Sequence, residues 1–373
     1  MAHAYTPGLK VTEKAVVRKD RRLPLKGQVL VKVGDQVKSD QIVAKTELPG
    51  NVQTVNVAGL LGILPEDVQA HMLKKPGEAV AKDEPLAMSK SFFGLFKSVC
   101  KAPVAGVVES ISGITGQVIL REPPLPVQVR AYIDGRVVEV AEAEGVTVET
   151  YGTFVQGIFG IGGETDGQIA MAVDDPSQEL TADHIKPEHK GKVIIGGSLV
   201  RHRALTRAAE LGVRAIVVGG INDADLRAFL GYDIGVAITG TEEKGVTLVV
   251  TEGFGRMTMA KKTFNLLKSK QGLKASVNGA TQIRAGVMRP EVIVPLEGRA
   301  QADEVHKSDS GLELGMAIRV IRHPYFGRIG KVAALPHELQ KLESESHARV
   351  LEVEFEDGTK AVVPRANVEL IED

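Results

Sequence analysis

The spacing of hydrophobic residues changes along the chain and predicts two kinds of region. Residues 26–120 and 313–373 hold short runs in which apolar and polar residues alternate between glycine turns. Alternation with a period of two is typical of half-buried strands, so both regions are expected to be β. Residues 191–298 combine continuous β-branched runs with helical spacing, which is typical of parallel strands covered by helices. The pattern therefore predicts an α+β protein of several domains.

The clearest unit of the α/β region spans residues 192–222. A buried strand over residues 193–195 is followed by a pair of glycines, and Ser198 is expected to cap the next helix. That helix carries apolar residues at helical spacing and ends at Gly212, after which residues 215–218 form a second strand. The order strand, helix, strand predicts a βαβ unit.

The rest of the α/β region continues this alternation. Asn222 or Asp223 is expected to cap a short helix that ends at Gly231, and Thr258 is expected to cap a later helix. Further strands are expected over residues 233–240, 245–253 and 291–296. The later helix should turn four residues inward, namely Met259, Thr263, Phe264 and Leu267. Its lysines should face water, namely Lys261, Lys262, Lys268 and Lys270.

A sequence repeat occurs in the N-terminal region, after a polar and basic stretch that is expected to be an extended arm. Residues 34–35 are a Gly-Asp turn signal, and the Gly-Glu pair at 77–78 repeats it with similar apolar residues behind it. Gly106 corresponds more loosely to Gly50. Two similar halves of this sort are expected to form one small sandwich of interlocked hairpins.

The segments "VLVKVGDQVKSDQIVAK" and "KAPVAGVVESI" resemble the biotinyl/lipoyl-type barrel-sandwich hybrid, over roughly residues 25–120. They are similar in particular to the non-carrier version in the C subunit of ion-pumping electron-transport complexes. Carrier versions modify a lysine at an exposed hairpin tip; here the first tip, "TELPGN", has no lysine, and Lys90 is the nearest candidate in the second. The electron-transport proteins gather cysteines for iron–sulfur clusters, whereas this chain has only Cys100. The resemblance therefore implies a shared fold without the shared chemistry.

The tail "HPYFGRIGKV" and the alternating residues before it resemble the KOW motif of SH3-like barrels in ribosomal and transcription-elongation proteins. The match covers about residues 313–373, with Pro324 where that family often has glycine. The resemblance implies that a loop carrying Tyr325 and Phe326 meets RNA or a protein partner.

Charge in this tail favours a protein partner over RNA. Eleven Asp and Glu residues outnumber eight Lys and Arg residues from residue 313 to the end. The basic residues that do cluster are Arg319, Arg322, His323, Arg328 and Lys331. The tail is therefore expected to be a protein-contact module.

Overall composition narrows the class of protein further. A net charge of −1 argues against general affinity for nucleic acid or anionic lipid. The single cysteine, Cys100, excludes an internal disulfide and a metal site built from several thiolates. No stretch approaches the ~20 apolar residues of a membrane span, and the N-terminal stretch does not read as a signal peptide. The expected setting is the cytoplasm, with no membrane association, metal or cofactor.

Two glycine turns of the α/β region form the candidate ligand site. If their strands are parallel in one sheet, both turns lie beyond the carboxyl ends of the strands, where ligands bind in open α/β folds. Basic residues at the start of a helix oppose the helix dipole, which favours an anion beside the exposed N–H groups. The candidate anion-binding residues are Gly196, Gly197, Ser198, Arg201, Arg203, Gly253, Gly255, Arg256 and Arg284.

The same residues have another interpretation. The glycines can permit tight packing while the arginines pair with acids of another domain or subunit. The three-glycine spacing of a dinucleotide fingerprint is missing, so NAD is not expected. Glu252 is the candidate general base near both turns, but the sequence contains no recognisable nucleophile–base pair and no metal-ligand spacing, so catalytic and metal residues are not assigned.

Aromatic residues give a second candidate surface. The candidate partner-binding residues are Phe92, Phe93, Phe96, Tyr325 and Phe326. The first three concentrate in one short loop, which forms either a satellite core or a docking site for another subunit. Five glycines between residues 157 and 167 are expected to form a wide structural turn, because no Lys-Ser/Thr ending of a phosphate-binding loop follows them.

These features predict an N-terminal arm, a barrel-sandwich-hybrid-like β domain with extra strands, an α/β domain and a C-terminal KOW/SH3-like barrel. The expected boundaries are 1–25, 26–175, 176–190 (linker), 191–298, 299–312 (linker) and 313–373. The preferred function is a non-catalytic soluble scaffold or assembly protein that self-associates as a homo-oligomer. An anion- or phosphometabolite-binding enzyme or enzyme subunit is the alternative, and a ribosome- or transcription-associated KOW factor is the second alternative.

Overall fold

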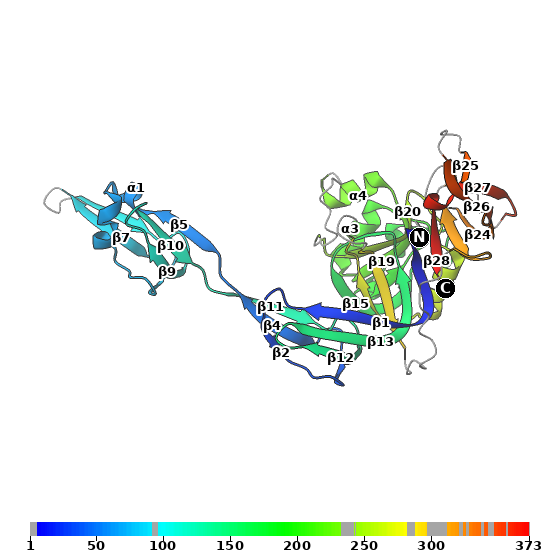
Figure 1. Ribbon diagram of the computed structural model, residues 1–373, viewed down its shortest axis with the longest axis horizontal. Coiled ribbons are helices and arrows are strands. Elements are labelled where there is room, and N and C mark those ends of the chain that lie inside the picture. Colours follow the sequence, from blue (N-terminus) through cyan, green and yellow to red (C-terminus); the bar gives the residue numbers. More distant parts are fainter. Residues whose placement is uncertain are drawn as a thin grey trace.

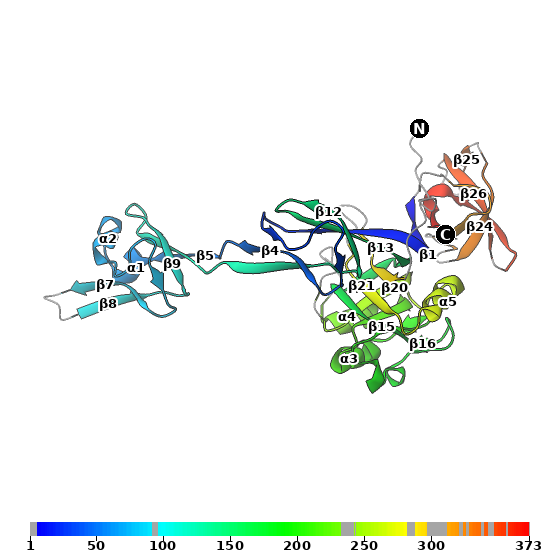
Figure 2. The same ribbon diagram turned by 90° about the horizontal axis from the view of Figure 1, so that it is seen from below.

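The protein is elongated, with a small lobe at one end and a larger body at the other (Figures 1 and 2). The computed structural model describes residues 6–91, 96–232, 242, 244–281, 288–296, 312–320, 324–325, 328–336, 339–341, 347–355 and 357–372. It is rich in strands, which form several sheets with a few short helices. This agrees at the coarse level with the predicted α+β class of several domains. Within the described residues, no helix is long and apolar enough to cross a membrane.

The predicted βαβ unit is present. Strands β17 (Val193–Ile195), β19 (Ala215–Ile221) and β20 (Thr247–Phe254) pair in parallel. Helix α3 (His202–Leu211) connects the first two strands and ends at Gly212 in the left-handed conformation, while α4 (Asp223–Leu230) follows the second. Helix α4 begins after Asn222 and ends at Gly231, as predicted, but the Asn222 side chain donates to Asp225 instead of capping the helix. The prediction of a strand over residues 233–240 lies outside the described residues.

Helix α3 begins later than predicted. Leu199–Val200 forms a short strand, β18, because both residues are buried between β16 (Glu179–Leu180) and β19. Ser198 is therefore not a helix cap. The expected linker over residues 176–190 contributes strand β16 and the buried Leu180 and Ile185 to the same core, together with the short helices η2 (Ala182–His184) and η3 (Pro187–His189).

Helix α5 (Lys261–Ser269) starts after Ala260, so Thr258 is not its cap. The four residues expected to face inward are all buried, as predicted. Lys270 differs from the expectation, because it is buried and its Nζ lies 3.1 Å from the Glu13 carboxylate. The unit is completed by β21 (Lys274–Asn278) and β22 (Glu291–Pro295), the latter at the position of the predicted last strand.

The expected N-terminal arm is a strand over most of its length. Strand β1 (Thr6–Arg22) pairs antiparallel with β13 (Gly145–Gln156) and parallel with β28 (Val368–Glu372). Buried Val11 and Val17 pack this strand against the body, so its polar residues belong to its outer face. Figure 2 shows that β1 joins the central sheet to the C-terminal part of the chain.

The glycine-rich segment after β13 is strand rather than a wide turn. It contains β14 (Phe159–Ile161) and β15 (Glu164–Met171), which pair with β20 and with β17 and β21 respectively. A Cβ atom on Gly160 would lie 2.6 Å from the carbonyl oxygen of Gly279. The glycine is needed because neighbouring backbones approach closely there.

Next to the body lies the inner lobe, formed by residues 27–48 and 125–141. Its strands are β2 (Gln28–Val29), β3 (Gln36–Val37), β4 (Ile42–Leu48), β11 (Leu125–Arg130) and β12 (Gly135–Ala141). They share a core with β1, β13 and β22.

The distal lobe, residues 51–122, is inserted between β4 and β11 and has a core of its own. Figure 1 shows it at the end of the molecule opposite the body. Its elements are β5 (Val52–Asn56), α1 (Val57–Leu61), η1 (Pro65–Asp67), α2 (Val68–His71), β6 (Ala79–Val80), β7 (Pro85–Ser91), β8 (Phe96–Lys101), β9 (Gly106–Ile111) and β10 (Gln117–Arg121).

The two copies of the repeat share the same local turn geometry. They belong to two different lobes, so the expected single sandwich is not formed. The Asp35 carboxylate accepts a hydrogen bond from the Lys32 N–H at 2.8 Å, and Glu78 accepts one from the Lys75 N–H at 2.9 Å. Each turn leads to a short strand that pairs with a different later strand, β3 with β12 and β6 with β9.

The strand register also corrects the second half of the repeat. Val37 lies opposite Gly135, as Val80 lies opposite Gly106. Gly106 therefore corresponds to Gly135 and not to Gly50.

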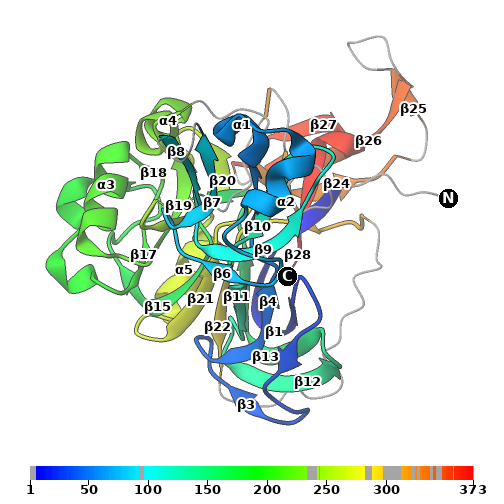
Figure 3. The same ribbon diagram turned by 90° about the vertical axis from the view of Figure 1, so that its left-hand side faces the viewer.

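The C-terminal part is an antiparallel sheet in the order β27, β26, β24, β23, β28, with β25 also pairing with β26. Its elements besides β28 are β23 (Ala317–Val320), β24 (Ile329–Ala334), β25 (Leu339–Lys341), β26 (His347–Phe355), β27 (Lys360–Pro364) and η4 (Arg365–Asn367). It has its own core. Figure 3 shows it on the opposite side of the body from α3 and α4.

Candidate functional site

The two glycine turns lie against each other at one edge of the parallel sheet, as predicted. The Gly219 N–H donates to the Gly197 carbonyl at 2.7 Å, and the Met257 N–H donates to the Ser198 carbonyl at 3.0 Å. Both turns follow the carboxyl ends of parallel strands, where ligands commonly bind in open α/β sheets. Gly255 lies in the same arrangement, since its N–H donates to the Ile221 carbonyl at 2.8 Å.

The glycines at this edge allow backbones to pack closely. A Cβ atom on Gly197 would lie 2.2 Å from the Gln178 carbonyl oxygen, and one on Gly220 would lie 2.1 Å from the Gly255 carbonyl oxygen. Such distances are far inside van der Waals contact. Gly253 and Gly255 also adopt positive φ angles of 150° and 96°. The tight-packing interpretation therefore accounts for these glycines without a ligand.

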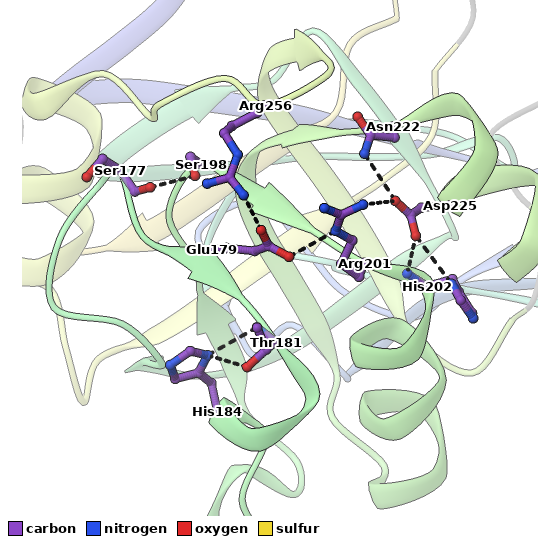
Figure 4. Close-up of polar contacts among 10 residues, drawn as sticks. All are labelled: Ser177, Glu179, Thr181, His184, Ser198, Arg201, His202, Asn222, Asp225 and Arg256. Atoms are coloured by element: carbon purple, nitrogen blue, oxygen red, sulfur yellow. Dashed lines mark hydrogen bonds and ion pairs between the residues drawn. The ribbon is translucent and has the colours of Figure 1, made fainter.

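The arginines of the candidate site are paired with carboxylates of the same chain. Figure 4 shows Glu179 between Arg201 and Arg256. The Arg201 Nε donates to one Glu179 oxygen at 2.9 Å, and Arg256 contacts the other oxygen. Glu179 lies in the segment expected to be a linker, so its place between the two arginines is not predicted from the sequence. The two arginines thus have an anionic partner already.

The second carboxylate is that of Asp225, a residue of α4 whose side chain lies at the start of helix α3. It accepts hydrogen bonds from the backbone N–H of His202 at 3.1 Å and from the Asn222 side chain at 3.2 Å, and Arg201 lies 3.5 Å away (Figure 4). The His202 Nδ1 lies 3.2 Å from the same carboxylate. The N–H group that an external anion would use is therefore already bonded.

Other predicted site residues do not converge on a ligand. The Ser198 hydroxyl donates to the Ser177 carbonyl at 2.7 Å, which ties the turn to the preceding segment. Arg203 is exposed on α3, and Arg284 lies outside the described residues. His184 contacts Thr181 and closes a short 3-10 turn (Figure 4). The cluster binds β16, α3, α4 and the turn after β20 together.

The environment of Asp225 predicts a pH dependence of stability. Burial alone would raise the pKa of this carboxyl, but hydrogen bonds from His202 and Asn222 and the charge of Arg201 lower the pKa below its ordinary value. A lowered pKa in the folded state stabilises the protein above the unfolded pKa of about 3.9, and this contribution is lost as the pH falls through the folded pKa. Asp225→Asn is therefore expected to cost about 1.5 kcal/mol at neutral pH and almost nothing in strong acid.

Urea unfolding of the parent and of Asp225→Asn, from neutral pH into the acidic range, measures this difference in the free energy of unfolding. Asp223→Asn is the control, because Asp223 is exposed and its ion pair is a surface i,i+4 pair with Arg227 on the same helix. An equal loss for Asp225→Asn at every pH would contradict the assignment.

Glu252, the candidate general base, is part of a buried ion pair between the α/β unit and the C-terminal sheet. One of its oxygens accepts the Ala260 N–H at 3.1 Å, and the other lies 3.1 Å from the Arg319 guanidinium. Arg319 also donates to the Thr251 and Glu252 carbonyls at 3.1 and 2.7 Å. Both charged side chains are almost fully buried. A carboxylate enclosed in this way has no free face for a substrate proton.

The predicted basic patch of the tail is not formed as expected. Arg319 is buried, and Arg328 lies 2.6 Å from Asp357 with its guanidinium 3.8 Å from the centre of the Phe355 ring. Tyr325 packs on Phe355 at 5.3 Å between ring centres, so it belongs to the core of this sheet. Lys331 is exposed; Arg322, His323 and Phe326 lie outside the described residues.

The phenylalanine loop falls largely outside the described residues, which include neither Phe92 nor Phe93. The backbones of β7 and β8 pair Lys90 with Lys97 and Ser91 with Phe96. Lys90 thus belongs to a strand, one pair before the end of the described hairpin.

The distal lobe exposes apolar residues that the sequence did not single out. Leu60, Leu64 and Ile114 are 64 %, 61 % and 91 % exposed. Seven of the seventeen exposed large hydrophobic residues in the described part of the chain belong to residues 51–122. Single exposed residues are ordinary, whereas a concentration within one lobe makes that lobe a candidate contact surface. One feature of the sequence does indicate the exposure of Leu64 and Ile114, because both lie within glycine turns.

No protein-family model matches the chain, and the comparison with curated proteins also gave no match. Within the described residues, no group of three or more His, Cys, Asp or Glu side chains is placed to hold a metal ion.

Proposed function

We propose that this protein is a non-catalytic scaffold that self-associates through its distal lobe. We also propose that the inner and distal lobes are barrel-sandwich hybrids of the non-carrier type, and that the C-terminal sheet is an SH3-like barrel of the KOW class acting in protein contact. The observation that carries the functional proposal is the exposed apolar surface of a lobe that projects from the body.

That surface, here called the distal patch, consists of Leu60, Leu64 and Ile114. Each residue is a close sequence neighbour of one contact region, in which the Ala58 N–H of helix α1 donates to the Gly116 carbonyl at 3.0 Å. Gly116 also lies against Pro65, the neighbour of Leu64. The patch therefore combines the end of α1 with the turn that faces it. Apolar groups gathered in this way gain free energy when another surface covers them.

The charges of the distal lobe favour a second copy as the partner. Residues 51–122 contain seven Lys and Arg residues and seven Asp and Glu residues. Two such lobes can approach without net repulsion, whereas a nucleic acid would find no excess of positive charge. A homo-oligomer held by contact between lobes is the simplest arrangement that covers the patch.

The alternative, an anion-binding enzyme that uses the glycine turns, requires Arg201 and Arg256 to leave Glu179. The energy of those pairs would have to be recovered from the ligand. An RNA-binding role of the tail requires basic residues beyond Arg319 and Arg328, since the first is buried and the second is paired. We therefore retain the scaffold as the proposal.

Replacing the distal patch tests this function. The triple variant Leu60→Ser, Leu64→Ser and Ile114→Ser is expected to weaken self-association roughly tenfold or more, because each leucine or isoleucine contributes more than 1 kcal/mol when buried. Light scattering at several protein concentrations measures the change.

The matched control removes similar exposed apolar surface elsewhere, with Val33→Ser, Leu314→Ser and Val362→Ser, at residues 61 %, 66 % and 57 % exposed. It should associate like the parent. Equal association of parent and distal-patch variant would remove the distal lobe from the proposal, while a parent that stays monomeric would remove self-association altogether.

A further inference from the structure

A polar pocket of about 470 Å³ lies where three parts of the chain meet. Its walls are the end of β1, the end of β11 and the first residue of β15. Apart from Val129 its lining is polar, namely Asp20, Arg21, Arg22, Gln128, Arg130 and Glu164. The volume falls within the range of about 300–1,000 Å³ that is usual for small-molecule sites. The lining favours a charged ligand over an apolar one.

Arg21 forms a fixed wall of this pocket. Its guanidinium donates to both oxygens of Glu164 at 2.7 Å and to the Arg130 carbonyl at 2.7 Å. The group also lies over the Tyr132 ring, 5.4 Å from its centre. Among the described residues these contacts use three of its five N–H groups, so two remain to donate from a side chain that is already held in place.

Arg22 and Arg130 contribute positive charge that is less engaged. The Arg22 guanidinium lies 4.0 Å from Glu144, and both side chains are well exposed, so this pair is weak. Among the described residues, the exposed Arg130 side chain makes no hydrogen bond or ion pair.

The acids of the pocket do not cancel this charge. Glu164 is balanced by Arg21, and Asp20 accepts the Thr147 hydroxyl at 2.6 Å. Among the remaining lining residues, the positive charges of Arg22 and Arg130 therefore exceed the negative charge of Asp20.

We propose that this pocket binds a small ligand through a phosphate or carboxylate group. A guanidinium donates two parallel N–H groups to either oxyanion, which is why arginine is the usual residue for such ligands. The site differs from the glycine turns, whose arginines are paired with Glu179 and Asp225. It is also independent of self-association through the distal lobe.

Calorimetric titration of the full-length protein with inorganic phosphate and, separately, with citrate tests the proposal. At least one anion should bind, its affinity should fall as salt is raised, and the stronger of the two identifies the class of oxyanion. The double variant Arg22→Gln and Arg130→Gln should weaken this binding roughly tenfold or more.

Arg136→Gln is the matched control, because Arg136 is an exposed arginine of the same lobe outside the pocket. It should bind like the parent, and the melting temperatures of all three proteins without anion should agree. Absence of binding by both anions at millimolar concentration would overturn the proposal. An equal loss for Arg136→Gln would also overturn it, since the effect would then be one of overall charge.

Discussion

Arg319→Met is expected to lower the free energy of unfolding by about 3–5 kcal/mol, because the substitution leaves Glu252 as a buried carboxylate without its cation. The guanidinium also donates to the carbonyls of Thr251 and Glu252, which lose their hydrogen bonds. These contacts join the C-terminal sheet to the end of β20. The loss should therefore appear both in urea unfolding and as faster proteolysis of residues 312–372.

Two further variants separate this effect from a general loss of charge. Arg328→Met removes the pair with Asp357, which lies on the surface, and should cost about 1 kcal/mol or less. The double variant Glu252→Gln and Arg319→Met removes both charges of this buried pair and should recover part of the stability. If Arg319→Met and Arg328→Met were equally stable, the buried pair would not fasten the two parts.

Gly50→Ala is expected to cost about 3 kcal/mol, because it forces apart the two chain segments that connect the distal lobe to the inner lobe. A Cβ atom on Gly50 would lie 1.8 Å from the Glu122 carbonyl oxygen. The contacts at this crossing are the Glu122 N–H to the Asn51 carbonyl at 2.9 Å and the Arg121 guanidinium to the Gly50 carbonyl at 3.2 Å. Both bonds should be lost or lengthened.

Urea unfolding measures the cost, and limited proteolysis near residues 49–51 and 122–126 measures the loosening of the connection. Gly113→Ala is the matched control, since a Cβ atom at Gly113 of the distal lobe meets open space. The control should unfold and be cleaved like the parent. A Gly50→Ala protein that behaves like Gly113→Ala would mean that the connection is not held by this close crossing.

Local patterns in the sequence predicted local structure well. Strand β17, the end of α3 at Gly212 and the helix after Asn222 depend on neighbours in the sequence, and each was found. The predicted start of α3 is wrong because Leu199 and Val200 pair with β16, which precedes them by some twenty residues. A helical spacing pattern cannot distinguish such a pair from the first turn of a helix.

Non-local pairing accounts for the other differences. The turns of the repeat are visible in the sequence, yet the strand that completes each copy lies much further along the chain, at Gly106 and Gly135. The ion pairs likewise join segments that lie apart in the sequence. Arg201 and Arg319 looked available in the sequence, whereas their partners, Glu179 and Glu252, lie in other segments. Charge pairing across a fold is set by topology, which spacing along a chain does not encode.

The mass of the unmodified protein in solution tests the central claim most directly. Light scattering over a micromolar concentration series is expected to give a multiple of the 39.8 kDa chain mass that rises towards a fixed value. A constant mass of one chain across the whole series would contradict the proposal that this protein is a self-associating scaffold.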